Sequence, residues 1–462
     1  MVARDRWLSV ADPIHGIIQF DRHDETHQLL LAVMNSWAFQ RLRRIYQMGL
    51  AEMVFPNATH TRFVHSLGSA HLMGEAIRHL EREPVFRDFI HQEYPGTSIS
   101  MKTLLMLGIL IHDIGHAPLS HTLEDILHLK DLGLSHDEYW NRKILTEDNG
   151  LNLIWERFGS DLPQAVCQFM GASCDGKPGE KHFLGSLISS QLDMDRLDYL
   201  LRDSHFLGVK YGQIESQRII DTLQIAPRGI DGRPKVAVRA EAIPAVEHYL
   251  FGRHEAYKMA LHPLDKASEI SLKMTLLRFQ WARQQGVETG DPAEGLFQLM
   301  SDPHSVTTQQ YLMLDDHTIW EAVKHWSVYS RDPVLHELAG RLMRHQLFKY
   351  VNLRAYGITC DLQDIPEVYE ALREHYDRRD LSFQYGFDEI TVKARPLYRH
   401  DKEPIWISTA EGKVVDLKEL SSLPLHAEGN RGEKHLVFVW DRIAREFLRG
   451  KLREYVGLKR NR

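Results

Sequence analysis

The stretch ILIHDIGHAPLSH (residues 109–121) places three histidines and an aspartate at the end of an apolar run. The residues from 100 onward, SMKTLLMLGILI, predict a buried helix whose leading serine could cap its start. Gly115 and Pro118 favour the end of that helix. Because adjacent helical side chains point about 100° apart, His112 and Asp113 reach one common point only where the helix ends. A histidine beside a carboxylate at the mouth of a buried helix needs a balancing charge, which a divalent cation supplies.

Two distant segments offer further ligands for such a cation. ATHTRFVHSLG (58–68) predicts a second helix with Arg62 and His65 in its first turns. QLDMDRLDYLLRD (191–203) predicts a third helix, in which four side chains lie on or near one polar stripe. These are Asp195, Asp198, Tyr199 and Arg202. Spacing alone therefore predicts a metal-assisted hydrolase.

Helical periodicity dominates from about residue 28 to about residue 350. IAPRGIDGRPKVAVRAE (225–241) interrupts it with a Gly/Pro turn before an alternating run, which predicts a hairpin. After about residue 352 the pattern changes to short strand-like runs followed by a closing helix. We therefore predict a mostly α fold. It has a helical lobe with a small hairpin over residues 1–352 and a smaller α+β subdomain over residues 353–462.

The composition is that of an ordinary globular protein, with 43% hydrophobic and 26% charged residues among 462. The net charge of −7 gives no global electrostatic case for nucleic-acid binding. The N-terminus lacks an apolar signal segment, and no apolar run is long enough to cross a bilayer. Three cysteines without zinc or redox spacing fit a reducing compartment. These features predict a cytoplasmic protein without a membrane partner.

The ordered set of His65, His112 with Asp113, and Asp195 resembles the H…HD…D fingerprint of the HD-domain metal-dependent phosphohydrolases. The dipeptide itself is common, but longer strings carry a closer resemblance. They are DPIHG (12–16), FQRLRRIYQMG (39–49), HTRFVHSLG (60–68), HDIGHAPLSH (112–121) and LDMDRLDYLLRDSHFLG (192–208). Together they resemble the deoxynucleoside triphosphate triphosphohydrolase branch of this family over roughly residues 8–352.

The resemblance implies one divalent transition metal bound by His65, His112, Asp113 and Asp195. Two imidazoles with two carboxylates suit Mn²⁺, Fe²⁺, Zn²⁺ or Ni²⁺ without choosing among them, and Mg²⁺ would accompany the nucleotide. In this branch water attacks the α-phosphorus and releases a nucleoside and inorganic triphosphate. The implied substrate is a (deoxy)nucleoside triphosphate. The likeness also implies a homodimer or homotetramer with nucleotides, including an activator, at the subunit contacts.

The resemblance implies roles for the residues around the metal as well. His121 would act as acid and base, oriented by Glu124 one helical turn later. His116 and His136 would face the substrate phosphates. The other substrate-binding positions that the resemblance implies are Gln47, Arg62, Arg196, Tyr199, Asp203, Arg253, Tyr257 and His262.

Some positions depart from the pattern of the branch. Leu261 stands where many relatives carry a tyrosine that packs on the deoxyribose, so selection against ribonucleotides is not implied. The activating-nucleotide site of the vertebrate members has an asparagine, an aspartate and an arginine where this chain has Ala11, Asn35 and His345, whereas Gln40, Arg43 and Lys349 are retained. An asparagine cannot accept two hydrogen bonds from a guanine edge as a carboxylate can. Our hypothesis is that activation by a guanine triphosphate is lost or altered.

Two alternatives stay open. The first is another HD-type nucleotide phosphohydrolase: a nucleotidase, a cyclic-nucleotide phosphodiesterase or an alarmone hydrolase. The alarmone branch has acidic residues soon after its HD pair, where this chain has residues 114–116 (IGH), and the GYP signature of the cyclic-dinucleotide branch is not found. The second is a nucleotide-sensing or single-strand-binding module with a vestigial site, for which Arg218 and Arg239 near the hairpin would supply basic contacts. The complete ligand set and the pairing of His121 with Glu124 favour an active enzyme over this module.

Overall fold

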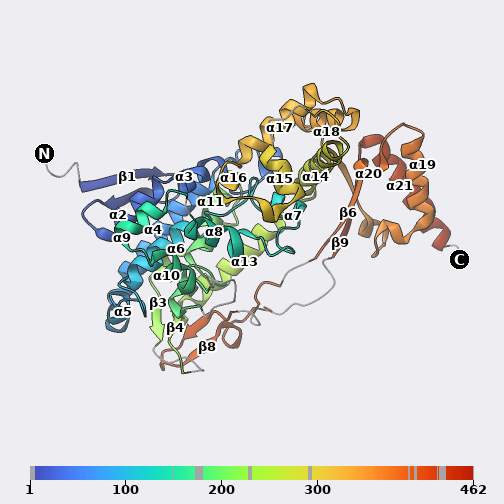
Figure 1. Cartoon of the computed structure of the whole chain (residues 1–462). Helices are drawn as coiled ribbons and strands as arrows, with labels where there is room; N and C mark the ends of the chain where they lie inside the picture. Colours follow the sequence, from blue (N-terminus) through green and yellow to red (C-terminus); the bar gives the residue numbers. More distant parts are fainter. Residues whose placement is uncertain are drawn as a thin grey trace.

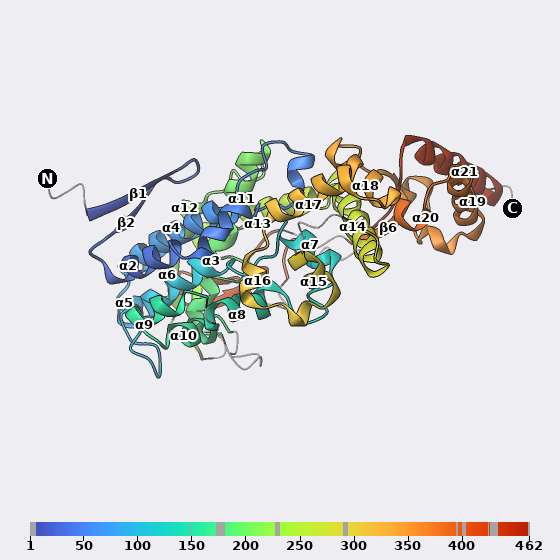
Figure 2. The same ribbon diagram turned by 45° about the horizontal axis from the view of Figure 1, so that its top comes forward.

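The computed structural model describes residues 6–147, 149–171, 181–226, 232–289, 294–393, 396–399, 403–423, 425 and 433–460. In this part the chain is mostly helical, which confirms the predicted fold class. The molecule is elongated, with the N-terminal residues at one end and the C-terminal helices at the other (Figure 1). A view turned by 45° shows the same arrangement (Figure 2). No helix among the described residues is long and apolar enough to cross a membrane.

Helices make up most of the described elements, and short strands lie near both ends and in the middle of the chain. The described helices are α2 (Glu25–Met34), α3 (Trp37–Gln40), α4 (Arg62–Leu80), α5 (Pro84–Ile90), α6 (Met101–Ile111), α7 (His121–Ile126), α8 (Asn141–Thr146), α9 (Asn152–Phe158), α10 (Leu162–Phe169), α11 (Met194–Leu207), α12 (Ser216–Ile220), α13 (Ile243–Ala260), α14 (Pro263–Gln284), α15 (Glu294–Ser301), α16 (Thr308–Leu312), α17 (Asp316–Tyr329), α18 (Pro333–Met343), α19 (Pro366–Asp377), α20 (Phe383–Gly386) and α21 (Arg442–Arg460). The described strands are β1 (Trp7–Asp12), β2 (Gly16–Asp21), β3 (Leu223–Ala226), β4 (Lys235–Arg239), β5 (Lys349–Asn352), β6 (Phe387–Val392), β7 (Trp406–Ser408), β8 (Val414–Asp416) and β9 (Lys434–Val439).

Helix α6 is the central element of the helical lobe. All its residues except Lys102 and Thr103 are buried, as expected for a segment that is apolar on every side. The Ser100 hydroxyl accepts a hydrogen bond from the Thr103 N–H at 3.2 Å, which confirms the predicted cap. Helices α2, α4 and α10 pack around α6. Their apolar faces form one continuous core that holds the end of α6 in place.

The apolar recurrence after residue 28 forms several short elements rather than one helix. Helix α2 ends at Met34, and the Ser36 hydroxyl begins α3 by accepting a hydrogen bond from the Phe39 N–H at 3.3 Å. A 3₁₀ turn follows over Arg41–Arg44. The fully buried Arg41 donates from Nη1 to the His116 carbonyl oxygen at 2.9 Å. This break therefore lets a buried arginine reach the loop after α6.

The N-terminal residues form a hairpin that the sequence analysis does not predict. Strands β1 and β2 pair antiparallel, from Trp7 opposite Asp21 to Asp12 opposite Gly16. Gly16 has a φ of 75°, a left-handed conformation that glycine adopts at little cost. The Asp12 carboxylate closes the turn by accepting the N–H groups of Ile14 and His15, each at 2.9 Å. The DPIHG motif is therefore the turn of this hairpin.

The predicted hairpin near residues 225–241 is confirmed, because β3 and β4 pair antiparallel. Its residues 227–231 lie outside the described residues. Strand β4 also pairs in parallel with β7, so that the sheet runs β3–β4–β7–β8. A second sheet runs β5–β9–β6. Both sheets join strands from the two sides of residue 352, and the predicted domain boundary there stays a prediction.

The C-terminal residues contain the predicted short strands and the closing helix α21. Helix α19, which packs against α21 at the far end of the molecule, was not predicted (Figure 1). Its apolar residues Val368, Leu372 and Tyr376 recur with helical spacing and are buried. The sequence therefore contains the helical spacing of α19, although the strand-like runs near it are more prominent.

Candidate metal centre and active site

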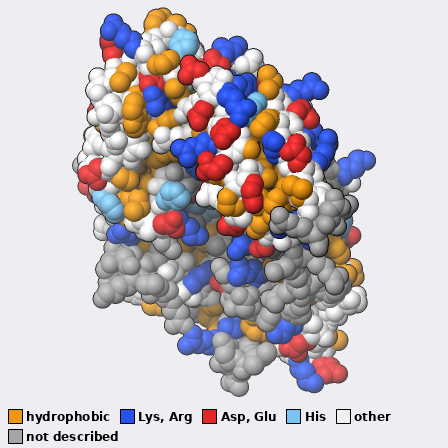
Figure 3. Space-filling view, turned by 90° about the vertical axis from the view of Figure 1, so that its right-hand side faces the viewer, with side chains coloured by type: hydrophobic (Ala, Val, Ile, Leu, Met, Phe, Trp, Pro, Cys, Tyr) orange, Lys and Arg blue, Asp and Glu red, His pale blue; other side chains and the backbone are white. Residues whose placement is uncertain are grey.

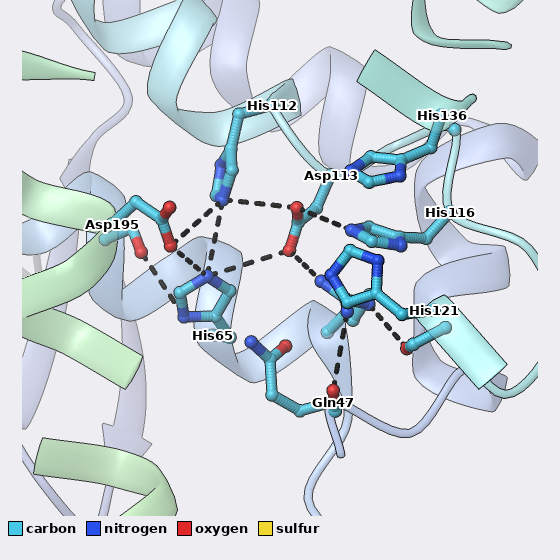
Figure 4. Close-up of polar contacts among 12 residues, drawn as sticks. Gln47, His65, His112, Asp113, His116, His121, His136 and Asp195 are labelled. Atoms are coloured by element: carbon cyan, nitrogen blue, oxygen red, sulfur yellow. Dashed lines mark hydrogen bonds and ion pairs between the residues drawn. The ribbon is translucent and has the colours of Figure 1, made fainter. Parts of the chain in front are cut away.

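Three helices bring the four predicted metal ligands together. His65 lies in the first turn of α4, and Asp195 lies in the first turn of α11. His112 is the residue at which α6 ends, and Asp113 follows it. The side chains meet at one point, with the two carboxylates on opposite sides of the two imidazoles (Figure 4). The structure thus brings His112 and Asp113 to one point where their helix ends.

The distances among these side chains are short. The Nε2 atoms of His65 and His112 lie 3.3 Å apart. Asp195 Oδ1 lies 3.1 Å from His65 Nε2 and 3.5 Å from His112 Nε2. On the other side, Asp113 Oδ1 lies 3.4 Å from His112 Nε2, and Asp113 Oδ2 lies 3.7 Å from His65 Nε2. Two nitrogens and carboxylate oxygens from both sides therefore converge on one small volume.

The hydrogen bonds of both histidines leave Nε2 as the atom that faces this volume. His65 Nδ1 donates to Asp198 Oδ2 at 2.8 Å, and His112 Nδ1 donates to the Ile109 carbonyl oxygen at 2.7 Å. A hydrogen on Nδ1 leaves an unshared electron pair on Nε2, which is the arrangement of a metal-binding histidine. The donor set of two such imidazoles and two carboxylates fits a divalent transition metal.

The electrostatics also favour a positive charge at this point. Burial lowers the pKa of His65, but its pairing with Asp195 and Asp198 outweighs burial and raises the pKa to about 10. Burial opposes ionisation of Asp195 as well, yet His112 and His65 hold the pKa of this carboxyl well below its usual range. In the metal-free site a proton on His65 Nε2 therefore balances the ionised carboxylates, and a metal cation would take the place of that proton.

Arg62 contacts Asp113, whereas the resemblance implied a contact with phosphate. Its Nη1 donates to Asp113 Oδ2 at 2.5 Å, and its Nε donates to the Ser120 hydroxyl at 2.8 Å. His116 Nε2 donates to the other oxygen, Asp113 Oδ1, at 3.1 Å. Arg62 also lines a cavity beside the metal ligands, so one guanidinium borders both Asp113 and this open space.

A second cluster lies beside the metal ligands and contains His116, His121, Glu124 and His136, whose nitrogens and carboxylate oxygens lie within 4.8 Å of one another. Glu124 accepts from His136 Nδ1 at 2.9 and 3.0 Å, and from the His136 N–H at 3.0 Å. Its contact with His121 Nδ1 is longer, at 3.3 Å, and the His121 side chain is 67% exposed. Glu124 therefore holds His136 more firmly than His121, which the sequence analysis had paired with it.

The charge states of this second cluster differ from residue to residue. Burial opposes ionisation of Glu124, but hydrogen bonds from His121 and His136 hold the pKa of this carboxyl far below its usual range. Burial, reinforced by the positive charge of Arg62, holds the pKa of His116 well below its usual value. The His116 and His136 rings stack with centroids 3.5 Å apart. Glu124 is thus an ionised acceptor, and His116 is neutral.

The loop between α6 and α7 is fixed at several points. Asn141 bridges it by accepting the Gly115 N–H at 2.6 Å and donating to the His112 carbonyl oxygen at 2.5 Å. A Cβ on Gly115 would lie 2.5 Å from the backbone nitrogen of Asn141, so only glycine fits at position 115. Leu119 and Ser120 have φ values of 54° and 56°, a strained conformation for residues with a side chain. Sequence reasoning did not identify Asn141, because nothing local marks a partner from another helix.

Asp316 holds the strained turn from the opposite side. One oxygen accepts the Leu119 N–H at 2.6 Å and the other accepts the Tyr46 N–H at 2.7 Å. Burial raises the pKa of this carboxyl to about 7, although both backbone donors favour its ionised form. Asp316 therefore ties the histidine-bearing loop to the segment that carries Gln47.

We expect Asp316→Ala to lower the free energy of unfolding by about 2–4 kcal/mol, because two buried N–H groups lose their acceptor. Asp316→Asn keeps one acceptor oxygen and should lose less. Thermal denaturation of the two variants and the parent checks this order. A D316A variant as stable as the parent would show that the turn does not depend on Asp316.

The candidate active site opens into a cavity of about 900 Å³. Metal ligands, the histidine cluster and most of the implied substrate-binding residues share this space. The predicted residues that line it are Gln47, Arg62, His112, Asp113, His116, His121, His136, Asp195, Arg196, Tyr199, Asp203, Arg253 and Tyr257. His65 and Glu124 are buried behind the cavity wall: His65 faces the metal position through Nε2, and Glu124 contacts His121 and His136.

His262 does not belong to the described residues that line this cavity. Its Nδ1 accepts the Leu264 N–H at 3.3 Å at the start of α14, and its ring meets Phe55 edge to face. His262 therefore caps α14, and its contact with substrate stays a prediction.

A C-terminal segment contributes to the cavity, which the sequence analysis missed. Pro396, Leu397 and Arg399 line the cavity. Arg253 Nη2 donates to the Leu397 carbonyl oxygen at 2.7 Å, and Arg253 Nη1 donates to the Gln191 carbonyl oxygen at 3.0 Å. No local sequence pattern predicts this segment at the cavity, because its contact with Arg253 joins residues far apart along the chain.

The residues at the implied activator positions lie in several elements. Ala11 is opposite Ile17 in the hairpin, and Asn35 is the C-cap of α2. His345 donates to the Met53 carbonyl oxygen at 2.5 Å. Among the retained residues, Arg43 Nε donates to Gln40 Oε1 at 2.8 Å. The hypothesis of a lost or altered activator stays a prediction.

Comparisons with known proteins agree with this geometry. The HD domain family model matches residues 62–203, a span that contains all four metal-ligand candidates. The chain is 31% identical to the uncharacterized protein MG461 of Mycoplasma genitalium over 438 residues, which cover 89% of this chain and 93% of that protein. A solved phosphohydrolase structure from Bacteroides thetaiotaomicron is similar with a TM-score of 0.74 and 28% identity, covering 94% of this chain and 99% of that one.

The chain is also similar to the deoxynucleoside triphosphate triphosphohydrolase SAMHD1 of Homo sapiens. The two are 27% identical over 374 residues, which cover 75% of this chain. The match covers 55% of the human enzyme, so this chain spans just over half of that relative.

Proposed function

This chain belongs to the HD-domain family that includes the deoxynucleoside triphosphate triphosphohydrolase SAMHD1, and from that premise we propose its reaction. It is a metal-dependent phosphohydrolase that cleaves (deoxy)nucleoside triphosphates at the α-phosphate. The products are a nucleoside and inorganic triphosphate. The single observation that carries the proposal is the pair of facing Nε2 atoms, 3.3 Å apart and flanked by Asp113 and Asp195, beside a large cavity.

The residues that would hold the metal are His65, His112, Asp113 and Asp195. When bound there, a divalent metal supplies Lewis-acid polarisation of a phosphate and a lowered pKa for water. The cavity volume of about 900 Å³ lies within the usual range of ligand pockets and has room for a nucleoside triphosphate.

Arginines in the cavity suit the negative charge of a triphosphate. Arg253 is held by two carbonyl oxygens, which orient its guanidinium without neutralising its charge. Arg196 donates to the Ser190 carbonyl oxygen at 2.6 Å and to the Tyr199 hydroxyl at 3.2 Å. Arg196 Nε also lies 3.3 Å from Asp193 Oδ2. Arg253 is therefore the cation that most favours a substrate with several phosphate oxygens over an uncharged one.

Glu124 and its histidines provide the proton transfer in this proposal. The ionised Glu124 accepts the Nδ1 hydrogens of His136 and His121, and this leaves the Nε2 atom of each ring to take up or release a proton. The leaving 5′-oxygen of the nucleoside needs such a proton. His121 remains the proposed acid because it is the more exposed of the two rings, with His136 as the ring nearer to the phosphates.

Gln47 and Asp203 are the proposed contacts of the sugar. Gln47 Oε1 is buried and has no hydrogen-bond partner among the described residues, so it can accept from a hydroxyl group. Asp203 accepts from His60 Nε2 at 2.8 Å, which orients its carboxylate at the cavity wall. A sugar hydroxyl that donates to Gln47 would therefore satisfy a buried acceptor.

We expect a screen of all canonical ribo- and deoxyribonucleoside triphosphates to yield inorganic triphosphate with at least one of them. The screen is run with Mn²⁺, Fe²⁺, Zn²⁺, Ni²⁺ and Mg²⁺ in turn, and each product is separated by ion chromatography. Adding dGTP to each reaction should not switch on a second nucleotide, because Asn35 replaces the guanine-reading carboxylate. Orthophosphate or pyrophosphate as the product would favour another HD-type phosphohydrolase instead.

A nucleic-acid-binding module has less support. Arg218 and Arg239, the basic residues near the hairpin, both lie beside Glu241, at 3.9 and 3.3 Å. On the face shown in Figure 3, Lys and Arg side chains are interspersed with Asp and Glu rather than gathered into one basic patch. A homodimer or homotetramer with nucleotides at its contacts stays a prediction from the family likeness.

A further inference from the structure

The turn of the N-terminal hairpin lies directly behind the candidate metal centre. We propose that His15 is a positioning residue for the metal: it holds Asp198, and Asp198 in turn holds the metal ligand His65. This inference rests on the proposed metal centre and extends it to the DPIHG motif, to which the chemistry gives no role. The contacts form one unbroken chain from the hairpin to His65 Nε2.

Each contact in this chain is short and buried. His15 Nε2 donates to Asp198 Oδ1 at 2.6 Å. Asp198 Oδ2 accepts from His65 Nδ1 at 2.8 Å, on the far side of the ring from the metal position. The side chains of Asp198 and His65 are fully buried, and that of His15 is only 7% exposed. Water therefore has little access to replace any of these partners.

Arg202 fixes the same carboxylate from a second direction. Its Nε and Nη2 donate to the two oxygens of Asp198 at 2.8 and 2.9 Å. Its Nη1 donates to Asp12 Oδ2 at 2.7 Å, and Asp12 also closes the hairpin turn that carries His15. Residues of the hairpin and of α11 thus hold Asp198 together, through hydrogen bonds from His15 and Arg202.

On the side of α4, the packing leaves no room for Asp198 to move toward Gly68. A Cβ on Gly68 of α4 would lie 2.0 Å from Asp198 Oδ1 and 2.2 Å from Arg202 Nη2. The carboxylate therefore fits only because position 68 lacks a side chain. With Arg202 bound to both of its oxygens, Asp198 depends on His15 to complete its hydrogen bonds and to keep Oδ2 directed at His65.

The effect on the metal follows from the orientation of His65. A carboxylate that accepts from Nδ1 keeps the hydrogen there, aims Nε2 at the metal and makes it a better donor. Losing His15 leaves a buried carboxylate oxygen short of a donor, so Asp198 is free to shift toward Arg202 and away from His65. Removal of such an outer partner weakens metal binding by about 10- to 100-fold.

The test is a metal titration of four proteins: the parent, His15→Ala, His15→Gln and His71→Ala. The glutamine amide nitrogen stands in for Nε2 and keeps a donor toward Asp198. His71 of α4 is the matched control, because its ring lies 5.1 Å from the His15 ring, whereas the hydrogen bonds to Asp198 among the described residues come from His15, His65 and Arg202. Each full-length chain is stripped with a chelator and titrated with Mn²⁺, with binding followed by electron paramagnetic resonance.

We expect a dissociation constant for Mn²⁺ about 10- to 100-fold higher in H15A, and values near that of the parent in H15Q and H71A. Circular dichroism reports whether each chain is folded. Should H15A not fold, His15→Asn takes its place, since the shorter amide cannot reach Asp198.

Equal Mn²⁺ affinity in the parent and H15A would overturn the positioning role while leaving the metal centre intact. Equal weakening in H15A and H71A, or no recovery in a folded H15Q, would also overturn it, because a general packing role predicts those results. A folded parent that binds no Mn²⁺ would overturn the metal centre itself, and the inference with it.

Discussion

Replacing both His112 and Asp113 with alanine should abolish metal binding and lower phosphohydrolase activity by at least about 10³-fold. These two residues supply one imidazole and one of the two flanking carboxylates of the candidate metal centre. A single histidine with a single carboxylate is too small a donor set to hold a transition metal at the site. Metal content is measured by inductively coupled plasma mass spectrometry, and activity by release of inorganic triphosphate.

The double variant needs a control for its fold. His248→Ala, which alters an exposed histidine of α13, should keep the metal, the activity and the helical circular dichroism spectrum of the parent. The double variant should keep the circular dichroism spectrum of the parent but lose both the metal and the activity. A folded double variant with unchanged metal content would contradict the assignment of these ligands.

Glu124→Gln should slow turnover by about 10²- to 10⁴-fold while the metal content stays unchanged. The ionised carboxylate holds the Nδ1 hydrogens of both His136 and His121, and a neutral amide can accept only through its single oxygen. The loss of activity should appear in kcat, because proton transfer depends on the contacts of Glu124 with its two histidines, whereas substrate binding does not. Steady-state kinetics on the metal-loaded variant measure it.

Single variants separate the two histidines that share Glu124. His121→Ala should lower kcat with the KM little changed if His121 is the acid, whereas His136→Ala should raise the KM if that ring contacts phosphate. Loss of metal from E124Q would instead mean that the cluster of His116, His121, Glu124 and His136 is itself a metal site, against the present account.

The helices that carry the metal ligands could be predicted, because each has a strong local signal. Helix α6 is apolar from Leu104 to Ile111, has a serine at its start and a Gly and a Pro soon after its end. Those signals place His112 and Asp113 at the helix end. The meeting of His65 and Asp195 with this pair came from the resemblance, because spacing along the chain does not specify which helices pack together.

The surroundings of the ligands could not be predicted. Asp195 and Asp198 lie near one stripe of α11, yet they bind opposite nitrogens of the same imidazole. That division depends on the orientation of the His65 ring, which is set by packing in α4. The contact of His15 with Asp198 and that of Leu397 with Arg253 are also tertiary contacts, which no local sequence pattern predicts.

The most direct measurement is hydrolysis of a nucleoside triphosphate by the metal-loaded protein in ¹⁸O-labelled water, with the products analysed by mass spectrometry. Attack of water on the α-phosphorus with loss of the 5′-oxygen predicts unlabelled nucleoside and one ¹⁸O atom in inorganic triphosphate. A label in orthophosphate, pyrophosphate or a nucleoside monophosphate, or no turnover of any nucleotide, would contradict the proposed reaction.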